Sequence, residues 1–215
     1  MNATVSTFSI VDLAGYSALT EAHGDQGAAD AATALYRATR ELLDEYGTEE
    51  LKTLGDAVLL RSDRAGDALS LAARLVCDVG AREGGLGLRA GLDTGPALHR
   101  DGEWFGSVLN RAARIVDFAE RGAVLLSGAT HAAALSEGSP TRFHRLGTRA
   151  VKNIPEPLEI YEMCHGNGQS GLAVDPVCRM LLDPERAPES RDGEDGKVYF
   201  CSHACASAYD ASAQR

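Results

Sequence analysis

Two aspartates lie where strands are expected to end. Asp12 follows the apolar segment 8–11, and Asp56 comes directly after Gly55 in a predicted hairpin turn. One interpretation makes Asp12 a helix cap and Asp56 a turn residue. The other places both carboxylates at the ends of neighbouring strands, where they share a pair of Mg²⁺ or Mn²⁺ ions, because hard cations that bridge phosphate oxygens need oxygen ligands.

Two further segments carry groups suited to phosphate. Gly15, Tyr16 and Ser17 follow Asp12 at the start of a helical stretch, where free backbone amides at a helix N-terminus can bind a phosphate group. Asn110 and Arg114 are four residues apart in an expected helix, so both project from one face. That face is either a solvated polar surface or a grip for a phosphoryl group in its transition state.

Three of the five cysteines, Cys178, Cys201 and Cys205, lie near the C-terminus. Cys201 and Cys205 are four residues apart, so a short helix would place both sulfurs on one face, with Cys178 arriving from a loop. Three thiolates suit Zn²⁺ or Cu⁺, and the alternative is three buried cysteines without a metal. His203 is a candidate fourth ligand, although its spacing places it off that face. The other histidines, His23 among them, show no ligand spacing and are expected at the surface or in loops.

The composition limits the partners and the compartment. The chain has 215 residues and a formal net charge of −10, which argues against a nucleic acid or an anionic membrane as partner. No apolar run approaches the ~18 residues of a membrane helix, and the N-terminus lacks the pattern of a signal peptide. We therefore expect a cytoplasmic protein, with thiols that bind metal rather than form a disulfide framework.

The chain divides at a glycine-rich segment. We expect one domain over residues 1–164, a flexible linker over 165–173 and a small module over 174–215. The apolar pattern of the first part predicts these elements: a strand at 7–11, a helix at 27–46, a hairpin at 50–61, a helix at 65–79, a strand at 86–92, a helix at 104–120, a strand at 123–127 and a strand pair at 142–163. This order predicts an α+β sandwich of the ferredoxin-like type.

Three motifs in this order resemble the class III adenylate/guanylate cyclase catalytic domain. They are Phe-Ser-Ile-Val-Asp-Leu-Ala-Gly-Tyr-Ser at 8–17, Lys-Thr-Leu-Gly-Asp-Ala at 52–57 and Trp-Phe-Gly-Ser-Val-Leu-Asn-Arg-Ala-Ala-Arg at 104–114. The segment 91–96 and the region of Lys152 fit the same family. The resemblance covers residues 5–163.

The resemblance implies roles for seven residues. It implies that Asp12 and Asp56 bind the metal ions. It implies that Asn110 and Arg114 orient the ribose and stabilise the transition state. It also implies that Lys52 and its acidic partner Glu103 bind the purine, and that Lys152 contacts the phosphates. Adenylate cyclases usually carry Asp where this chain has Glu103, and guanylate cyclases typically carry Glu where it has Lys52. Lys52 therefore indicates ATP.

The family reaction implied for this chain converts ATP to 3′,5′-cyclic AMP and pyrophosphate with two Mg²⁺ or Mn²⁺ ions per site. In the family, the metal ligands and the transition-state residues come from different protomers, which implies a homodimer with two shared sites. Two alternatives stay open: a non-catalytic nucleotide-binding regulator of the same fold, and a metal sensor or carrier whose first domain is a dimerising scaffold.

The C-terminal segment resembles a YHS domain, a metal-associated module related to TRASH-type fingers. The resemblance rests on Asp-Pro-Val-Cys-Arg-Met at 175–180 and Tyr-Phe-Cys-Ser-His-Ala-Cys at 199–205. About 40 residues rarely build a sufficient hydrophobic core. We therefore expect this segment to fold only with metal, and to fold separately from the first domain.

Overall fold

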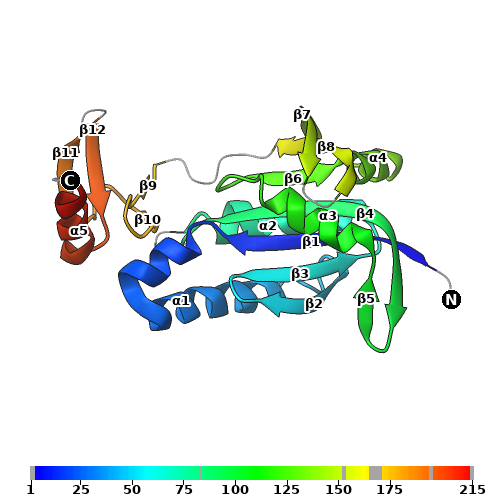
Figure 1. The fold of residues 1–215 in the computed structure, drawn as a ribbon, viewed down its shortest axis with the longest axis horizontal. Helices are drawn as coiled ribbons and strands as arrows, with labels where there is room; N and C mark the ends of the chain where they lie inside the picture. Colours follow the sequence, from blue (N-terminus) through cyan, green and yellow to red (C-terminus); the bar gives the residue numbers. More distant parts are fainter. Residues whose placement is uncertain (1–2, 83, 152–153, 165–170, 194–195, 214–215) are drawn as a thin grey trace.

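A mixed eight-stranded sheet forms the centre of residues 4–164 (Figure 1). The computed structural model describes residues 3–82, 84–151, 154–164, 171–193 and 196–213. The strand order is β2-β3-β1-β4-β6-β8-β7, and β5 pairs with the far end of β4. The strands are β1 (Thr4–Leu13), β2 (Thr48–Leu54), β3 (Ala57–Ser62), β4 (Leu88–Arg100), β5 (Glu103–Phe105), β6 (Val124–Ser127), β7 (Arg142–Val151) and β8 (Ile154–Cys164). The β4–β6 pair is parallel, and the other described pairs of this sheet are antiparallel.

Helices cover both faces of the sheet because its central strand carries apolar residues on both. On β1, Val11 and Leu13 belong to the large core shared with α1, α2 and α4, whereas Phe8 and Ile10 pack with residues of α3 on the other face. The helices are α1 (Tyr16–Arg40), α2 (Ala65–Arg74), α3 (Ser107–Val116) and α4 (Gly128–Ser136). A π-helical turn (Leu75–Val79) extends α2.

Gly91 allows α3 to lie directly on β4. A Cβ atom at this position would lie 2.3 Å from the backbone nitrogen of Val116 and 2.8 Å from the carbonyl oxygen of Ala112, so no larger side chain fits without moving the helix. This close approach brings the polar side chains of α3 near those of the central strands.

The C-terminal segment is a small unit that packs against the first domain. We refer to residues 171–213 as the tail. It contains β9 (Ala173–Val174), β10 (Leu181–Leu182), β11 (Glu189–Gly193), β12 (Gly196–Phe200) and α5 (His203–Ala213). The amide of Leu181 donates to the carbonyl of Gly85, and the amide of Gly84 donates to the carbonyl of Leu181, both at 2.7 Å. Cys178, Phe200 and Cys205 join the large core of the first domain.

The α+β prediction is confirmed, and the differences are local. The segment from Trp104 begins as β5 and becomes helical only at Ser107, so the start predicted for this helix is wrong. The helical stretch predicted after Asp12 and the helix predicted at 27–46 form one helix, α1, which begins at Tyr16 and ends at Arg40, and α4 was not predicted. The tail packs against the first domain, because its buried residues belong to the same core, and its separate folding stays a prediction. No helix in the described part of the chain has the length and apolar character to cross a bilayer.

Candidate active site

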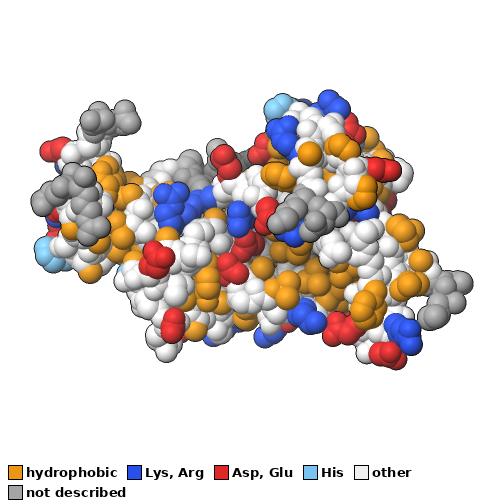
Figure 2. Space-filling model, viewed as in Figure 1, with side chains coloured by type: hydrophobic (Ala, Val, Ile, Leu, Met, Phe, Trp, Pro, Cys, Tyr) orange, Lys and Arg blue, Asp and Glu red, His pale blue; other side chains and the backbone are white. Residues whose placement is uncertain are grey.

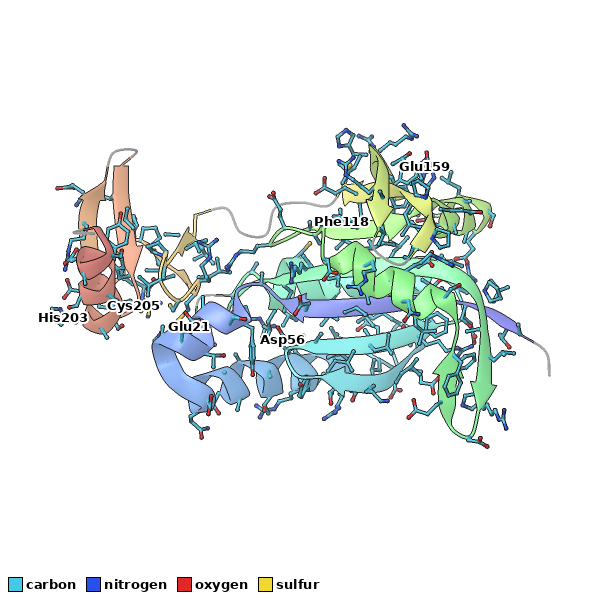
Figure 3. All side chains as sticks on the ribbon, viewed as in Figure 1. Glu21, Asp56, Phe118, Glu159, His203 and Cys205 are labelled. Atoms are coloured by element: carbon cyan, nitrogen blue, oxygen red, sulfur yellow. The ribbon has the colours of Figure 1, made fainter. Side chains whose placement is uncertain are left out.

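Asp12 and Asp56 lie side by side at one end of the central strands. Asp12 is opposite Ala57 in the β1–β3 register, and the amide of Leu13 donates to the carbonyl of Asp56 at 3.1 Å. The β2–β3 turn therefore brings Asp56 to the end of β1, where its carboxylate is close enough to raise the pKa of Asp12. Figure 3 labels Asp56 at this end of the hairpin.

Arg89 on β4 is a member of this site that the sequence interpretation missed. It lies directly opposite Asp12 in the β1–β4 register, and its Nε and Nη2 atoms donate to Asp12 Oδ2 at 2.8 and 2.5 Å. A charged residue within an otherwise apolar strand was the available signal. Because Arg89 occupies only one oxygen of the carboxylate, the other remains open to a second partner.

Asp12 Oδ1 is buried and has no hydrogen-bond partner. A buried polar atom without a partner is costly, so such an atom calls for an explanation. Burial raises the pKa of Asp12, the guanidinium of Arg89 partly opposes the shift, and the neighbouring charge of Asp56 raises the pKa further. A divalent cation between Asp12 and Asp56 would satisfy this oxygen and remove the repulsion, so these residues fit a Mg²⁺ or Mn²⁺ site.

The predicted phosphate-binding amides lie next to the two carboxylates. Gly15 caps α1 with φ 99°, a left-handed conformation that favours glycine, and Tyr16 and Ser17 form the first turn of α1. The first amides of a helix have no partner inside the helix and point toward an approaching anion. Arg121 holds this loop by donating to the carbonyls of Ala14 and Leu86, and burial lowers its pKa to about 10.

Lys52 and Glu103 are brought together from β2 and β5. The Nζ atom of Lys52 lies 3.3 Å from Oε2 of Glu103, and both side chains are about half exposed, at 51% and 58%. The pair thus offers one donor and one acceptor side by side at the surface of the sheet. Lys152, the other lysine predicted to bind nucleotide, lies outside the described residues.

Asn110 and Arg114 project from α3 and are exposed. Asn110 lines a cleft of about 640 Å³ between α3, the start of α4 and the segment 154–159 of β8; Asp12 and Asp56 do not line it. Arg114 makes a 3.4 Å ion pair with Asp117 at the surface. The structure therefore presents three groups of predicted residues: the carboxylates, the Lys52–Glu103 pair and the polar face of α3.

Arg111 has a structural role beneath α3. Its Nε donates to Oδ2 of Asp93 at 2.5 Å, and Ser127 Oγ donates to Oδ1 of Asp93, also at 2.5 Å. Asp93 is 1% exposed and lies beneath α3. Burial raises the pKa of Asp93, while Ser127 and Arg111 act in the opposite direction. The pair fixes α3 to β4 and β6 and thereby orients Asn110 and Arg114.

Replacing Arg111 with Met is expected to lower the free energy of unfolding by about 3 kcal/mol at neutral pH, because it leaves a buried carboxylate without its cation. The folded-state pKa of Asp93 already lies above its unfolded value, and this substitution raises it further. A carboxyl group with a raised folded-state pKa binds more protons in the folded than in the unfolded state. The loss of stability caused by Arg111→Met therefore grows as pH rises and shrinks as pH falls through the raised pKa of Asp93. Urea unfolding at several pH values measures both effects.

Arg100→Met is the matched control, since Arg100 pairs with Asp101 at an exposed surface and should change stability by less than about 0.5 kcal/mol. An Arg111→Met variant as stable as this control, or a difference that does not shrink on acidification, would contradict the role assigned to Arg111.

The three tail cysteines are also brought together, but Cys201 and Cys205 do not share the helix that their spacing predicts, because α5 begins at His203. Cys201 Sγ lies 3.5 Å from Cys178 Sγ and 3.7 Å from Cys205 Sγ. Burial raises the pKa of the Cys178 thiol, and it raises that of Cys201 to about 11, so neither is an activated nucleophile. His203 is directed away from the sulfurs and pairs with Glu189 at 3.2 Å (Figure 3). The residue that joins the sulfurs is His23 of α1, which contradicts the expectation that His23 lacks a ligand position.

Comparison with known proteins gives sequence relatives for part of the chain. An adenylate cyclase of Streptomyces griseus is 32% identical over 118 residues, which are 55% of this chain and 30% of the relative. A pH-sensitive adenylate cyclase of Mycobacterium tuberculosis is 32% identical over 130 residues, 58% of this chain and 33% of the relative. The chain thus spans about a third of the length of these curated relatives. No family model matches the chain.

Solved structures share the fold of the first domain. An adenylate/guanylate cyclase/hydrolase from Silicibacter pomeroyi superposes with a TM-score of 0.64 at 26% identity, and the match covers 76% of this chain and 98% of the other. An adenylyl cyclase from P. aeruginosa gives a TM-score of 0.62 at 19% identity, covering 77% and 97%. In its fold and over part of its sequence, the chain is similar to adenylate and guanylate cyclases.

Proposed function

We propose that residues 4–164 convert ATP to 3′,5′-cyclic AMP and pyrophosphate. The observation that carries the proposal is the buried, unpartnered Oδ1 of Asp12 beside Asp56, at the point where β1 leads into the first turn of α1. A cation site directly beside a helix N-terminus is suited to a bound triphosphate. The curated relatives named adenylate cyclase support the same assignment.

Asp12 and Asp56 would hold two Mg²⁺ or Mn²⁺ ions. Such ions, when bound, neutralise phosphate charge and make the ribose 3′-hydroxyl a better nucleophile toward the α-phosphorus. Arg89 opposes the rise in the pKa of Asp12 and orients its carboxylate, since it binds Oδ2 and leaves Oδ1 for the cation. The amides of Gly15, Tyr16 and Ser17 would bind phosphate oxygens at the start of α1.

The remaining predicted residues would bind the base and stabilise the transition state. Lys52 would donate to N1 of adenine, and Glu103 would accept from its amino group. Asn110 would orient the ribose, while Arg114 would meet the charge that grows on the phosphoryl group. Lys152 would contact the phosphates.

We further propose that two copies of the chain form the active site together. Asn110 and Arg114 are exposed in the single chain, and the electrostatic stabilisation that Arg114 can give is weak in water. Figure 2 shows hydrophobic side chains gathered on the face between α3 and the β2–β3 edge. Leu54, Phe105 and Phe118 are among the exposed large apolar residues, at 44%, 55% and 42%. A second copy covering this face would exclude water and bring the α3 residues of one protomer to the carboxylates of the other.

The base choice is tested by turnover of ATP and GTP side by side, with Mg²⁺ and with Mn²⁺. We expect kcat/KM for ATP to exceed that for GTP at least about 10-fold, because guanine presents an N–H to Lys52 and an oxygen to Glu103, which leaves polar groups unpaired. The ratio should stay below ~10⁴ because the Lys52–Glu103 pair is half exposed. Lys52→Glu should lower the ratio, whereas the exposed tail substitution Lys197→Glu should not. Equal turnover of both nucleotides would contradict the assignment to ATP.

A further inference from the structure

Four potential ligand atoms converge between the tail and the first domain. His23 Nε2 lies 3.5 Å from Cys201 Sγ and 3.9 Å from Cys205 Sγ, and all four ligand atoms, including Cys178 Sγ, lie within 4.8 Å of one another. Cys178 and Cys205 are buried, Cys201 is half-buried and His23 is exposed. The cluster is therefore closed on the sulfur side and open to solvent on the histidine side.

Four of the six separations between the ligand atoms are close to those of a tetrahedral site. With Zn–S bonds of about 2.3 Å and tetrahedral angles, two sulfurs lie about 3.8 Å apart, and a sulfur and an imidazole nitrogen lie about 3.6 Å apart. The observed separations are 3.5 and 3.7 Å between sulfurs, and 3.5 and 3.9 Å between sulfur and nitrogen. Three thiolates and one imidazole form a common ligand set for structural Zn²⁺.

Asp175 organises the backbone around the sulfurs. Its side chain is fully buried and accepts hydrogen bonds from the amides of Val177, Cys178 and Cys201, at 2.8, 3.2 and 2.8 Å. It thus fixes the loop that carries Cys178 against Cys201, which directly follows β12. Outer partners of this kind hold metal ligands in position.

His23 comes from the helix that begins at the candidate active site. It ends the first part of α1, which runs from Gly15 to a non-helical residue at Gly24 (φ 72°, ψ 179°). The tail also contacts the start of this segment, because a Cβ atom at Gly15 would lie 2.6 Å from Cβ of Arg179. Figure 3 shows Cys205 on the side of α5 that faces Glu21 of the same segment.

We propose that His23, Cys178, Cys201 and Cys205 bind one Zn²⁺ ion that links the tail to the segment 16–23 of the first domain. The ion binds His23 at one end of this segment. By holding the tail in place, it also keeps Arg179 against Gly15 at the other end. Metal occupancy of the tail therefore controls the order of the helix turn next to Asp12. The inference concerns metal binding and does not rest on the cyclase reaction.

The test uses the full chain, refolded or dialysed with Zn²⁺ alone and, in parallel, with Co²⁺ alone as a spectroscopic probe. We expect one tightly bound ion per chain, with the ligand-field and thiolate charge-transfer bands of a tetrahedral three-sulfur cobalt site. His23→Ala should weaken metal binding by more than about 100-fold, because about 100-fold is the largest loss expected for a residue that only hydrogen-bonds to a ligand. It should also change the cobalt bands, since water would replace the imidazole. His203→Ala is the matched control and should change neither property.

The variant His23→Cys distinguishes the loss of a metal ligand from a loss of folding. It supplies a thiolate at the same position and should bind the ion tightly in a tetrahedral site. Hydrogen exchange of residues 12–23 should increase on removal of the ion from the wild-type chain and from His203→Ala. Two results would overturn the proposal: a chain that binds neither Zn²⁺ nor Co²⁺ through its thiols, or a His23→Ala variant with the affinity and spectrum of the wild type.

Discussion

Replacing Asp56 with Asn is expected to lower cyclic AMP formation at least about 1000-fold. The substitution keeps the size of the side chain and leaves the backbone bond from Leu13 to the carbonyl of residue 56 in place, so the fold should persist. It removes half of the carboxylate pair proposed to hold the metal ions. Metal ions contribute several kcal/mol of charge stabilisation in reactions of this type, and each ~1.4 kcal/mol corresponds to a factor of ten in rate. Steady-state product formation with saturating Mn²⁺ measures the loss.

Asp63→Asn is the matched control, because Asp63 follows the other end of β3 and its side chain is 76% exposed. It should leave turnover within about twofold, as expected for a surface substitution of small energetic effect. An Asp56→Asn variant that keeps more than a tenth of wild-type turnover would contradict the role given to this carboxylate.

The strand ends that carry Asp12 and Asp56 could be predicted from the sequence, because the local pattern of residues determines where each strand ends. The β2–β3 hairpin follows from two short predicted strands around Gly55, and its turn necessarily carries Asp56. The pairing of Asp12 with Asp56 then depends on which strands are neighbours, which the apolar pattern does not specify. The resemblance to a known family, rather than composition, supplied that neighbour relation.

Arg89 and Arg111 could not be assigned from sequence because each acts across the sheet. Arg89 meets Asp12 only through the β1–β4 register, and Arg111 meets Asp93 only because Gly91 allows α3 to lie on β4. In the linear chain Arg89 and Asp12 are far apart, and the partner of each charge is set by tertiary packing.

His23 was missed for a related reason. Ligand spacing in sequence relates residues that are close along the chain, such as Cys201 and Cys205, but His23 belongs to α1 of the first domain. The tail was expected to be independent because its own apolar content is small. The structure places Cys178 and Phe200 in a core shared with the first domain, and this docking brings His23 to the sulfurs.

The boundary between β5 and α3 shows how a short pairing can outweigh helical pattern. Residues 104–120 have helical spacing, yet Trp104 pairs with His99 across the β4–β5 ribbon and packs edge-on against Phe8 at 5.8 Å. The strand holds Glu103 next to Lys52, so the departure from the predicted helix is itself part of the proposed base-binding site.

The central claim, that two copies of the chain build one site for ATP cyclisation, is tested most directly by mixing Asp56→Asn with Arg114→Ala. Each variant alone should be nearly inactive, since an arginine that stabilises phosphoryl-transfer charge is worth ~10³–10⁵ in rate. Random exchange makes half of the dimers mixed, and each mixed dimer keeps one intact site of two. The mixture should therefore regain about a quarter of wild-type activity.

Mixing Asp56→Asn with Asp12→Asn is the matched control and should restore nothing, because both lesions affect the residues that one protomer gives to a site. Native mass spectrometry of the same mixtures measures the fraction of mixed dimers. We expect cyclic AMP and pyrophosphate in equal amounts from the first mixture, at about a quarter of the wild-type rate. A first mixture that contains mixed dimers but is no more active than its separate components would contradict a site shared between two copies of the chain.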